Sequence, residues 1–355
     1  METYVTLKEI QNQPRLWKET IELIINKKKE IEIFLKPLKD KGNIKIIFIG
    51  AGSSEYVGNS LVLGLNPYYN YSMRSIASTE IVDDPYEIVD PNETYLAISF
   101  GRSGNSPESL HAITALNHVC SNVYHMAITC NKEGKLAQID RLIANSFVLV
   151  LPEETHDQGF AMTSSFSSMT LAAYFILHPT DINNKLKKMI EDVERLCGKW
   201  INQAKKIVQE FDFNRYVVLG GHESKGFAQE SALKMLELSS GRVSTQFDSP
   251  MGFRHGPKSF LNQDTLVVIF KRNSISSRAY ENDIIQEIER SPRRSKVQIL
   301  NYNFEDKYLS SLSQMIFTQS LAYFKSISLN INPDFPSDDN EVNRVVTGVT
   351  VYPYI

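Results

Sequence analysis

Two widely separated segments of the chain repeat one pattern, and this repeat limits what the chain can fold into. Ile44–Gly58 and Tyr216–Ala228 each run from an apolar, β-rich stretch into a glycine turn and then into a polar helix start. Gly50 and Gly220 occupy the same place in the two copies. Solenoid proteins repeat every roughly 20–50 residues, and a period of domain size predicts two similar α/β domains instead.

The strands that follow each copy extend the repeat. Thr94–Ser103 (TYLAISFGRS) follows the first copy and Thr265–Ser274 (TLVVIFKRNS) the second. Thr94 aligns with Thr265, at an offset one position longer than that of Gly50 and Gly220. Continuously apolar strands such as IKIIFIG at 44–50 are typical of a sheet covered on both faces, and such sheets are parallel in most folds. The predicted fold class is therefore α/β, with two tandem three-layer αβα lobes and mainly parallel sheets.

Composition places the chain among soluble globular proteins. Its 355 residues suffice for two domains, and 42% hydrophobic and 22% charged residues are ordinary values. The formal net charge of −3 and the lack of a Lys/Arg stripe argue against a nucleic-acid partner. No stretch approaches the roughly 18 apolar residues that span a bilayer, so no membrane partner is predicted.

Cysteine usage and the first residues predict a cytoplasmic protein. Cys120, Cys130 and Cys197 are odd in number and lack CxxC spacing, which disfavours a disulfide framework or a structural zinc site. The opening residues METYVT lack the basic and apolar regions of a secretory signal. We expect buried free thiols in a reducing compartment.

The chain divides into four predicted segments: an N-terminal helical segment at 1–40, a first lobe at 41–182, a linking helix at 183–212 and a second lobe at 213–355. In the first lobe, strands are predicted at 44–50, 73–77, 94–100, 123–129 and 146–151, and helices at 54–63, 106–117, 133–140 and 161–178. In the second lobe, strands are predicted at 215–220, 265–271 and 296–301, helices at 225–239, 278–289 and 307–327, a loop at 241–257 and an extended, β-branched tail at 341–354.

A Gly/Ser turn directly follows the first strand. Gly52, Ser53 and Ser54 lie at the start of the predicted helix, where glycine lets the backbone approach a ligand and free N–H groups favour an anion. A dinucleotide-binding fingerprint would need a third glycine where Glu55 stands. Phosphate binding and a plain structural turn are both open.

A second polar loop strengthens the phosphate hypothesis. It follows the apolar strand TYLAISF, at the carboxyl edge of the predicted sheet, where α/β proteins bind ligands. Hydroxyl and N–H donors without a lysine suit a phosphate monoester on a sugar better than a nucleoside triphosphate. A loop of capping residues is the alternative. The predicted substrate-binding residues of the two turns are Gly52, Ser53, Ser54, Gly101, Arg102, Ser103, Gly104, Asn105 and Ser106.

Three charged residues share one face of the predicted helix at 225–239. Glu230, Lys234 and Glu237 are spaced i, i+4 and i+7. An exposed, ion-paired stripe is the commoner meaning of this spacing. The rest of the helix is apolar, however, and a carboxylate held near apolar walls can have its pKa raised towards neutrality and act as a proton shuttle.

A histidine lies in the loop Phe253–Pro257 (FRHGP). A ring held ahead of a buried strand can transfer a proton near neutral pH, so His255 is a candidate acid or base. A surface or capping role is commoner for a loop histidine, and that alternative stays open. His156 and His222 are further loop candidates with less around them to support a role.

Together these four groups resemble the sugar isomerase (SIS) domain family, and the resemblance covers nearly the whole chain as two tandem copies. The isomerase half of glucosamine-6-phosphate synthase has a similar order of motifs. The resemblance implies that the turns hold a sugar phosphate through their serines, namely Ser53, Ser54, Ser103 and Ser106.

The same resemblance implies roles for the charged residues of the second lobe. Glu237 falls on the base that moves a proton between C1 and C2, and Glu230 and Lys234 fall on a supporting pair. His255 falls on a ring-opening histidine, which in the family is supplied to the site by a neighbouring subunit. The resemblance therefore implies a homodimer or higher homo-oligomer with a shared active site.

Finer motifs resemble the branch of galactosamine-6-phosphate deaminases and tagatose-6-phosphate ketose/aldose isomerases. They are Ser103–Ser109 (SGNSPES), Ala161–Phe166 (AMTSSF), Phe253–Ser259 (FRHGPKS) and Glu341–Val346 (EVNRVV). Thr347 stands where the synthase has a C-terminal lysine, and no glutaminase domain supplies ammonia. This branch implies release of ammonia, or isomerisation, in place of synthesis.

The predicted function is aldose–ketose isomerisation with hydrolytic deamination of a hexosamine 6-phosphate, taking galactosamine 6-phosphate to tagatose 6-phosphate and ammonia. No metal or coenzyme is expected, because the C1 aldehyde of the open sugar acidifies the C2 proton. Three alternatives stay open: a fructosamine-6-phosphate deglycase, a non-catalytic sugar-phosphate sensor and a dinucleotide oxidoreductase. Substrate assays separate the first, and the incomplete glycine fingerprint disfavours the last.

Overall fold

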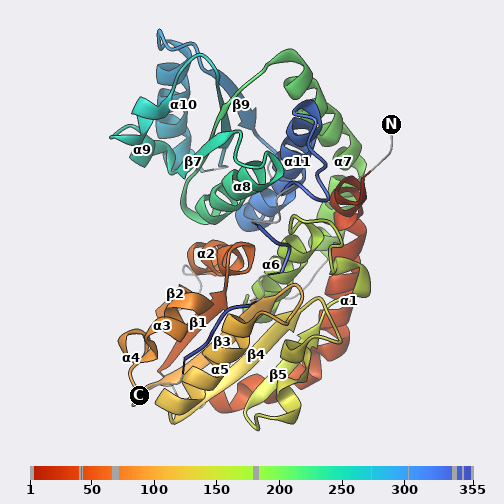
Figure 1. Cartoon of the computed structure of the whole chain (residues 1–355), viewed down its shortest axis with the longest axis vertical. Coiled ribbons are helices and arrows are strands. Elements are labelled where there is room, and N and C mark those ends of the chain that lie inside the picture. Colours follow the sequence, from red (N-terminus) through yellow and green to blue (C-terminus); the bar gives the residue numbers. More distant parts are fainter. Residues whose placement is uncertain are drawn as a thin grey trace. The chain divides into compact units, whose positions relative to one another are not determined.

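The computed structural model describes residues 4–39, 41, 43–65, 72–178, 184–272, 274–302, 304–337, 342–345 and 348–352 (Figure 1). The described residues form two compact units with one parallel sheet each. The first-sheet unit comprises Arg15–Asp157, Ser164–Leu186 and the tail Glu341–Ile355. The second-sheet unit comprises Met1–Pro14, Gln158–Thr163 and Lys187–Asn340. The predicted α/β class is confirmed, and so is the N-terminal helix, α1 (Val5–Lys39).

The first-sheet unit has five strands in the order β2-β1-β3-β4-β5, and every neighbouring pair is parallel. The strands are β1 (Ile44–Gly50), β2 (Ser72–Ala77), β3 (Thr94–Gly101), β4 (Asn122–Thr129) and β5 (Ser146–Val150). Its α-helices besides α1 are α2 (Ser53–Leu65), α3 (Ser78–Asp83), α4 (Pro85–Ile88), α5 (Pro107–Val119) and α6 (Ser164–Leu177). Two 3₁₀ helices, η2 (Lys135–Arg141) and η3 (Glu153–Thr155), lie between them.

Helices cover both faces of this sheet, as the continuously apolar strands predict. On one face, Ile47 and Ala97 of the sheet belong to a core with Ile81 of α3 and Leu116 of α5. On the other, α2 packs on β1 and β3, and α6 packs on α2 and β4 (Figure 1). The carboxyl ends of the strands are left for the connecting turns.

The second-sheet unit has four parallel strands in the order β7-β6-β8-β9. The strands are β6 (Arg215–Gly220), β7 (Ser244–Asp248), β8 (Thr265–Phe270) and β9 (Lys296–Leu300). The helices are α7 (Asn184–Glu210), η4 (His222–Ser224), α8 (Lys225–Leu238), α9 (Pro250–Phe253), η5 (Pro257–Phe260), α10 (Ile275–Glu289) and α11 (Lys307–Ser328). The α10 side of the sheet has a core that includes Leu219, Ile269 and Ile284, and α8 packs on β6 and α11 (Figure 1).

The repeat is confirmed in the strand order, because β7-β6-β8-β9 follows the same plan as β2-β1-β3-β4. It is also confirmed at the turn after the first strand of each copy. A Cβ on Gly50 would lie 2.3 Å from the backbone carbon of Ser54, and one on Gly220 would lie 2.4 Å from the backbone oxygen of Ser224. In both copies the helix start approaches the strand end so closely that only glycine fits.

The register of the strands corrects one part of the predicted alignment. Lys45 pairs with Tyr95 in the first sheet, and Arg215 pairs with Thr265 in the second. The step from Lys45 to Arg215 equals the step from Tyr95 to Thr265, so Thr265 is the counterpart of Tyr95. The alignment of Thr265 with Thr94 is wrong by one position. It matched two threonines, and the apolar residues beside them fit about equally well when shifted by one position.

Three further sequence predictions need correction. Residues 241–257, predicted as a loop, contain strand β7 and helix α9. The helix predicted at 133–140 is the 3₁₀ helix η2, and α3 and α4 were not predicted. β7 is a polar edge strand (STQFD) with mostly half-exposed residues, so it lacks the apolar signal of the central strands.

In the tail, 342–345 and 348–352 form no helix or strand, while Glu341, Val346, Thr347, Pro353 and Tyr354 lie outside the described residues. All three cysteines are buried and free, as expected. No helix among the described residues is long and apolar enough to cross a membrane. The predicted segment boundaries, 1–40, 41–182, 183–212 and 213–355, stay a prediction.

The glycine turns make a testable prediction. Gly50→Ala forces a Cβ into the backbone of Ser54, whereas a Cβ on Gly52 meets no atom within 4 Å and only its φ of +54° is unfavourable. We expect Gly50→Ala to reduce the free energy of unfolding by about 3 kcal/mol or more and Gly52→Ala by about 1 kcal/mol. Denaturant unfolding measures both. Equal losses would contradict the close approach at Gly50.

Candidate active site

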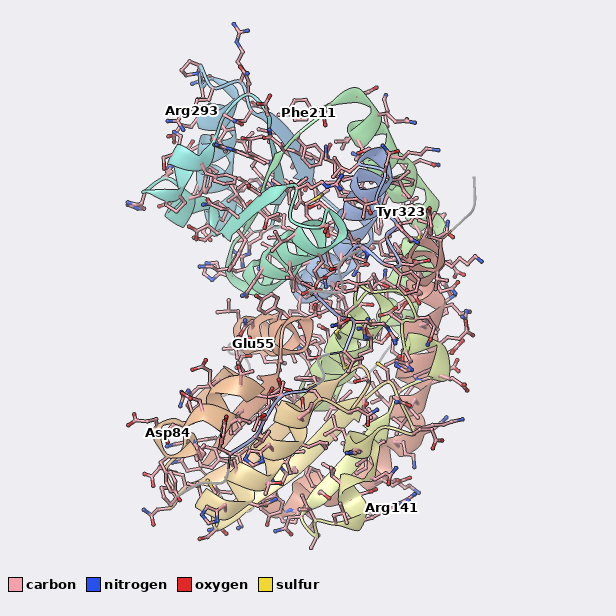
Figure 2. All side chains as sticks on the ribbon, viewed as in Figure 1. Glu55, Asp84, Arg141, Phe211, Arg293 and Tyr323 are labelled. Carbon is pink, nitrogen blue, oxygen red and sulfur yellow. The ribbon has the colours of Figure 1, made fainter. Side chains whose placement is uncertain are left out.

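The turn after β1 is tight and leads directly into helix α2. Gly52 adopts φ +54°, a left-handed conformation that favours glycine, and α2 begins at the next residue. Ser53 and Ser54 are 5% and 7% exposed, so their hydroxyls lie inside the first turn of α2. Glu55 follows on α2 (Figure 2), and burial raises the pKa of its carboxyl.

The loop after β3 is held by the residues that follow β4. Thr129 Oγ1 donates to the carbonyl of Gly101 at 2.7 Å, and Asn131 Nδ2 donates to the carbonyl of Ser103 at 2.9 Å. Gly104 adopts φ +65°, and a Cβ there would lie 3.1 Å from both Leu136 Cβ and Thr129 Oγ1. The loop conformation is therefore fixed by its neighbours.

The end of this loop starts helix α5. Asn105 Oδ1 accepts from the backbone N–H of Lys135 at 3.1 Å, and Ser106 Oγ donates to Glu108 Oε2 at 2.6 Å. Pro107 occupies the first helical position, where its missing N–H costs nothing. Since β1 and β3 are neighbouring parallel strands, their turns lie at the same edge of the sheet. The structure thus brings together the substrate-binding residues predicted from the sequence.

Arg102 has a contact that the sequence does not indicate. The residue is 6% exposed, and its Nη2 donates to the backbone oxygen of Arg344 in the tail at 2.7 Å. The predicted substrate-binding residue therefore also anchors the C-terminal segment.

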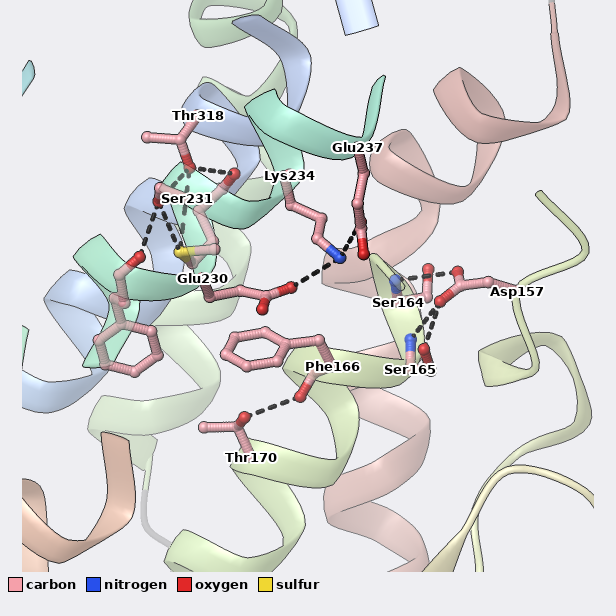
Figure 3. A network of polar contacts seen from close by, with 12 residues as sticks. Asp157, Ser164, Ser165, Phe166, Thr170, Glu230, Ser231, Lys234, Glu237 and Thr318 are labelled. Carbon is pink, nitrogen blue, oxygen red and sulfur yellow. Dashed lines mark hydrogen bonds and ion pairs between the residues drawn. The ribbon is translucent and has the colours of Figure 1, made fainter. Parts of the chain in front are cut away.

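The three charged side chains of α8 lie together (Figure 3), and two of them are buried. Lys234 Nζ lies 3.2 Å from Glu230 Oε1 and 2.6 Å from Glu237 Oε2. The side chains of Lys234 and Glu230 are 1% and 0% exposed, whereas that of Glu237 is 24% exposed. The alternative of an exposed, ion-paired stripe is excluded, and only one of the three charges reaches solvent.

Lys234 stays charged in this setting. Burial of its ammonium lowers the pKa, but the two carboxylates, Glu230 and Glu237, raise it by more, so that the pKa is raised overall. The neighbouring Ser231 hydroxyl bonds the carbonyl of Phe227 at 2.8 Å and the hydroxyl of Thr318 on α11 at 2.9 Å. The bond to Thr318 ties this part of α8 to α11.

Within residues 184–272, no hydrogen bond or ion pair joins the ring of His255 to the α8 triad, by which we mean Glu230, Lys234 and Glu237. His255 is exposed in the loop after α9. The loop is tied to α10, because Glu287 pairs with Arg254 at 3.0 Å and with Lys258. A histidine held outward on an anchored loop suits a role towards another molecule, which is how the family resemblance uses it.

The second copy of the glycine turn carries different side chains. His222 stands where Gly52 does in the first copy, and it takes the same left-handed conformation with φ +49°. Glu223 then stands where Ser53 does, and its carboxylate accepts two bonds from Arg272, the counterpart of Arg102, both at 2.8 Å. Arg272 of the second turn is thus already paired with a carboxylate of the protein itself. His222 has a backbone role that the sequence did not reveal.

Sequence reasoning missed Asp157. Its carboxylate accepts from the backbone N–H of Ser164 at 3.0 Å and of Ser165 at 2.8 Å, and so caps α6 (Figure 3). Its separation of seven positions from the helix is too long for a capping pattern to reveal. Next to it, burial first, and then Arg344 and Arg102, lower the pKa of His156. Among the described residues, no group of His, Cys, Asp and Glu is placed to hold a metal ion.

Comparison with known proteins gives a consistent answer. The SIS domain family matches residues 39–179. D-Galactosamine-6-phosphate deaminase AgaS from Shewanella sp. (strain ANA-3) is 38% identical over 359 residues, which cover 99% of this chain and 92% of the relative. AgaS from Escherichia coli is 34% identical over 367 residues, which cover 98% and 96%. The chain belongs to the SIS domain family.

Solved structures agree with this SIS assignment. A tagatose-6-phosphate ketose/aldose isomerase from Escherichia coli matches with a TM-score of 0.88 and 32% identity, covering 99% of this chain and 96% of the other. A candidate tagatose-6-phosphate ketose/aldose isomerase from Clostridium novyi NT matches with a TM-score of 0.91 and 40% identity, covering 99% and 95%. The predicted branch is confirmed, and the protein is an enzyme of sugar-phosphate chemistry.

The buried ion pair of this SIS protein makes a stability prediction. Lys234→Met leaves the Glu230 carboxylate buried without its cation, which we expect to cost about 3–5 kcal/mol of unfolding free energy. The double variant Glu230→Gln, Lys234→Met removes both charges and should recover most of the loss. Denaturant unfolding of the three proteins measures this. A single variant as stable as the double would contradict the pairing.

A second buried carboxyl gives a pH prediction. Glu281 on α10 is 2% exposed and accepts from the backbone N–H of Arg272 at 3.2 Å, and burial raises its pKa to about 7. A raised carboxyl pKa stabilises the fold fully below the ordinary value, and this stability is lost as the pH rises towards about 7. Glu281→Gln should remove that pH-dependent loss. The unfolding free energy of the variant relative to wild type should therefore rise by about 2 kcal/mol between pH 5 and pH 7.5.

Unfolding curves across this pH range measure the difference. Glu289→Gln, at the exposed end of the same helix, is the matched control and should run parallel to wild type. A Glu281→Gln curve that also runs parallel to wild type would show that Glu281 is not held neutral.

Proposed function

We propose that this protein deaminates galactosamine 6-phosphate, giving tagatose 6-phosphate and ammonia. The names of the AgaS relatives, identical at 34–38% over almost the whole chain, support this substrate. The observation that carries the proposal is Glu237, which contacts the buried Lys234 at 2.6 Å and still reaches solvent. A base needs contact with its charge partner and access to its substrate, and of Glu230, Lys234 and Glu237 only Glu237 is both a carboxylate paired with Lys234 and partly exposed.

The phosphate is proposed to bind at the two turns of the first-sheet unit. Ser53 and Ser54 place hydroxyl groups at the start of α2, where the helix dipole also favours an anion. The loop from Gly101 to Ser106 adds hydroxyls at the same edge of the sheet. Donors that are already fixed by their neighbours lose little conformational freedom on binding, which favours affinity for a small anion.

The proposed chemistry is a proton transfer followed by hydrolysis. After ring opening, the C1 aldehyde acidifies the C2 proton, and Glu237 removes it to give an enolamine. Return of that proton to C1 gives the imine of the ketose at C2. Water adds to C2, the C–N bond breaks, and ammonia leaves with the ketose 6-phosphate. Hexosamine phosphate and water thus become ketose phosphate and ammonia, with no oxidant or reductant required.

Lys234 and Glu230 are proposed to hold the base, and His255 to open the ring. A fixed ammonium restrains the Glu237 carboxylate in one orientation. The carboxylate is then already close to the geometry that the reaction needs. The exposure of His255 on its anchored loop supports a role in the site of a second copy of the chain. We therefore propose a homo-oligomer, located in the cytoplasm, with shared sites.

The names of the structural neighbours favour a second candidate, aldose–ketose isomerisation without deamination. The two reactions share ring opening and the C2-to-C1 proton transfer. They differ in the group at C2, since a hydroxyl yields a stable ketone and an amine yields an imine that hydrolyses. The same residues therefore serve either substrate.

Substrate assays test the proposal. Ammonia release is measured from galactosamine 6-phosphate and glucosamine 6-phosphate side by side, and interconversion of tagatose 6-phosphate with galactose 6-phosphate is measured in parallel. We expect rapid ammonia release from the galacto substrate. Glu237→Gln should reduce turnover by about 10²–10⁴-fold while substrate affinity stays within a small factor.

Glu289→Gln is the control for a lost carboxylate away from α8 and should keep wild-type turnover. Interconversion without ammonia release would replace the first candidate by the second. Glu237→Gln with near-normal turnover in both assays would remove Glu237 from the mechanism.

A further inference from the structure

The tail is joined to the proposed phosphate loop through Arg344. Arg102 Nη2 donates to the backbone oxygen of Arg344 at 2.7 Å, across 242 positions of the sequence. The guanidinium of Arg344 in turn donates to the backbone oxygen of Asp157. All three residues belong to the first-sheet unit. A residue near the C-terminus thus connects the end of β3 with the segment before α6.

Asp157 gives Arg344 a fixed point of attachment. Asp157 is fully buried, and its carboxylate accepts three bonds from the start of α6, including one from Ser165 Oγ at 2.5 Å (Figure 3). These bonds leave the peptide of Asp157 little freedom to move. The guanidinium of Arg344, which bonds this peptide oxygen, is therefore held in place through Asp157 by the start of helix α6.

The second copy shows what this contact does for Arg102. Its counterpart Arg272 is oriented by the carboxylate of Glu223, which also brings a negative charge. The carbonyl of Arg344 orients Arg102 without adding a formal charge. This contact therefore suits an arginine that stands beside an anion site, whereas a carboxylate would repel the anion.

We propose that Arg344 is a positioning residue for phosphate binding: its side chain fixes the tail at Asp157, and its carbonyl holds Arg102 at the start of the loop from Ser103 to Ser106. This inference rests on the proposed function, in which that loop holds the substrate phosphate. Arg344 touches neither the reacting carbons nor Glu237 in this role. Its loss should therefore weaken binding without slowing the chemical step.

Two variants of the full chain test the inference. Arg344→Met removes the guanidinium, and Arg344→Lys keeps the charge but loses the planar group that reaches the Asp157 oxygen. Calorimetric titration with tagatose 6-phosphate and with inorganic phosphate measures affinity, and steady-state assays give KM and kcat. A charge-assisted bond of this kind is worth about tenfold in affinity, so both variants should bind about tenfold more weakly, with kcat within about twofold of wild type.

Tyr352→Ala, an exposed position of the same tail, is the matched control and should bind as wild type does. The double variant Arg102→Met, Arg344→Met should lose little more affinity than Arg102→Met alone, because both act through one arginine. Additive losses, wild-type affinity of Arg344→Lys, or a fall in kcat at constant KM would each overturn the inference.

The outcome is separable from the proposed function. A wild-type protein that binds tagatose 6-phosphate but releases no ammonia refutes deamination. The affinities of the Arg344 variants for tagatose 6-phosphate still test whether Arg344 positions Arg102. If Arg344→Met does not fold, as shown by its melting curve, the affinity and kcat of Arg344→Lys decide the question.

Discussion

A side chain has no room at Gly50 or at Gly220, and this close approach of strand and helix organises both units. The Cβ of either residue would lie within 2.5 Å of the backbone four residues on. In both copies the residue two positions on, Gly52 or His222, takes the left-handed conformation within this tight turn. As a result, the first turns of α2 and η4 begin directly at the carboxyl edge of each sheet. This helix start at the sheet edge is the common plan from which the two copies differ.

The two copies use the same edge in opposite electrostatic ways. In the first, small hydroxyl residues and glycines line the turn, and Arg102 is oriented by a neutral carbonyl. In the second, Glu223 replaces Ser53 and forms a two-bond pair with Arg272, so the position suited to an external anion holds an internal one. A duplicated fold can therefore keep its backbone while one copy pairs its arginine with a carboxylate of its own. The second copy instead carries its charged groups further along the same connection, on α8.

The sequence predicted most of this arrangement, because the central strands and the long helices have strong apolar patterns. The central strands are mostly apolar, and glycines mark the turns that follow β1, β3 and β6. Edge strand β7 was missed because half-exposed positions need no apolar residues. The register error between Thr94 and Thr265 arose in an apolar run that has no internal marker. The tether from Arg344 to Asp157 was not predictable for a different reason: it joins residues 187 positions apart through a backbone oxygen, and a backbone acceptor leaves no trace in residue type.

The ion pair of α8 shows why buried charge is worth its energetic cost here. Replacing Glu230 and Lys234 by apolar residues of similar size would be neutral or stabilising in many proteins, so stability alone does not account for them. Their arrangement has one consequence that an apolar core lacks. Glu230 balances the charge of Lys234 inside the protein, so the three groups together carry one net negative charge when both carboxylates are ionised. That charge appears at Glu237, the one member that reaches solvent. The ammonium of Lys234 can thus hold the exposed carboxylate in place without leaving the interior positively charged, and the proposed role of Glu237 as a base depends on this arrangement.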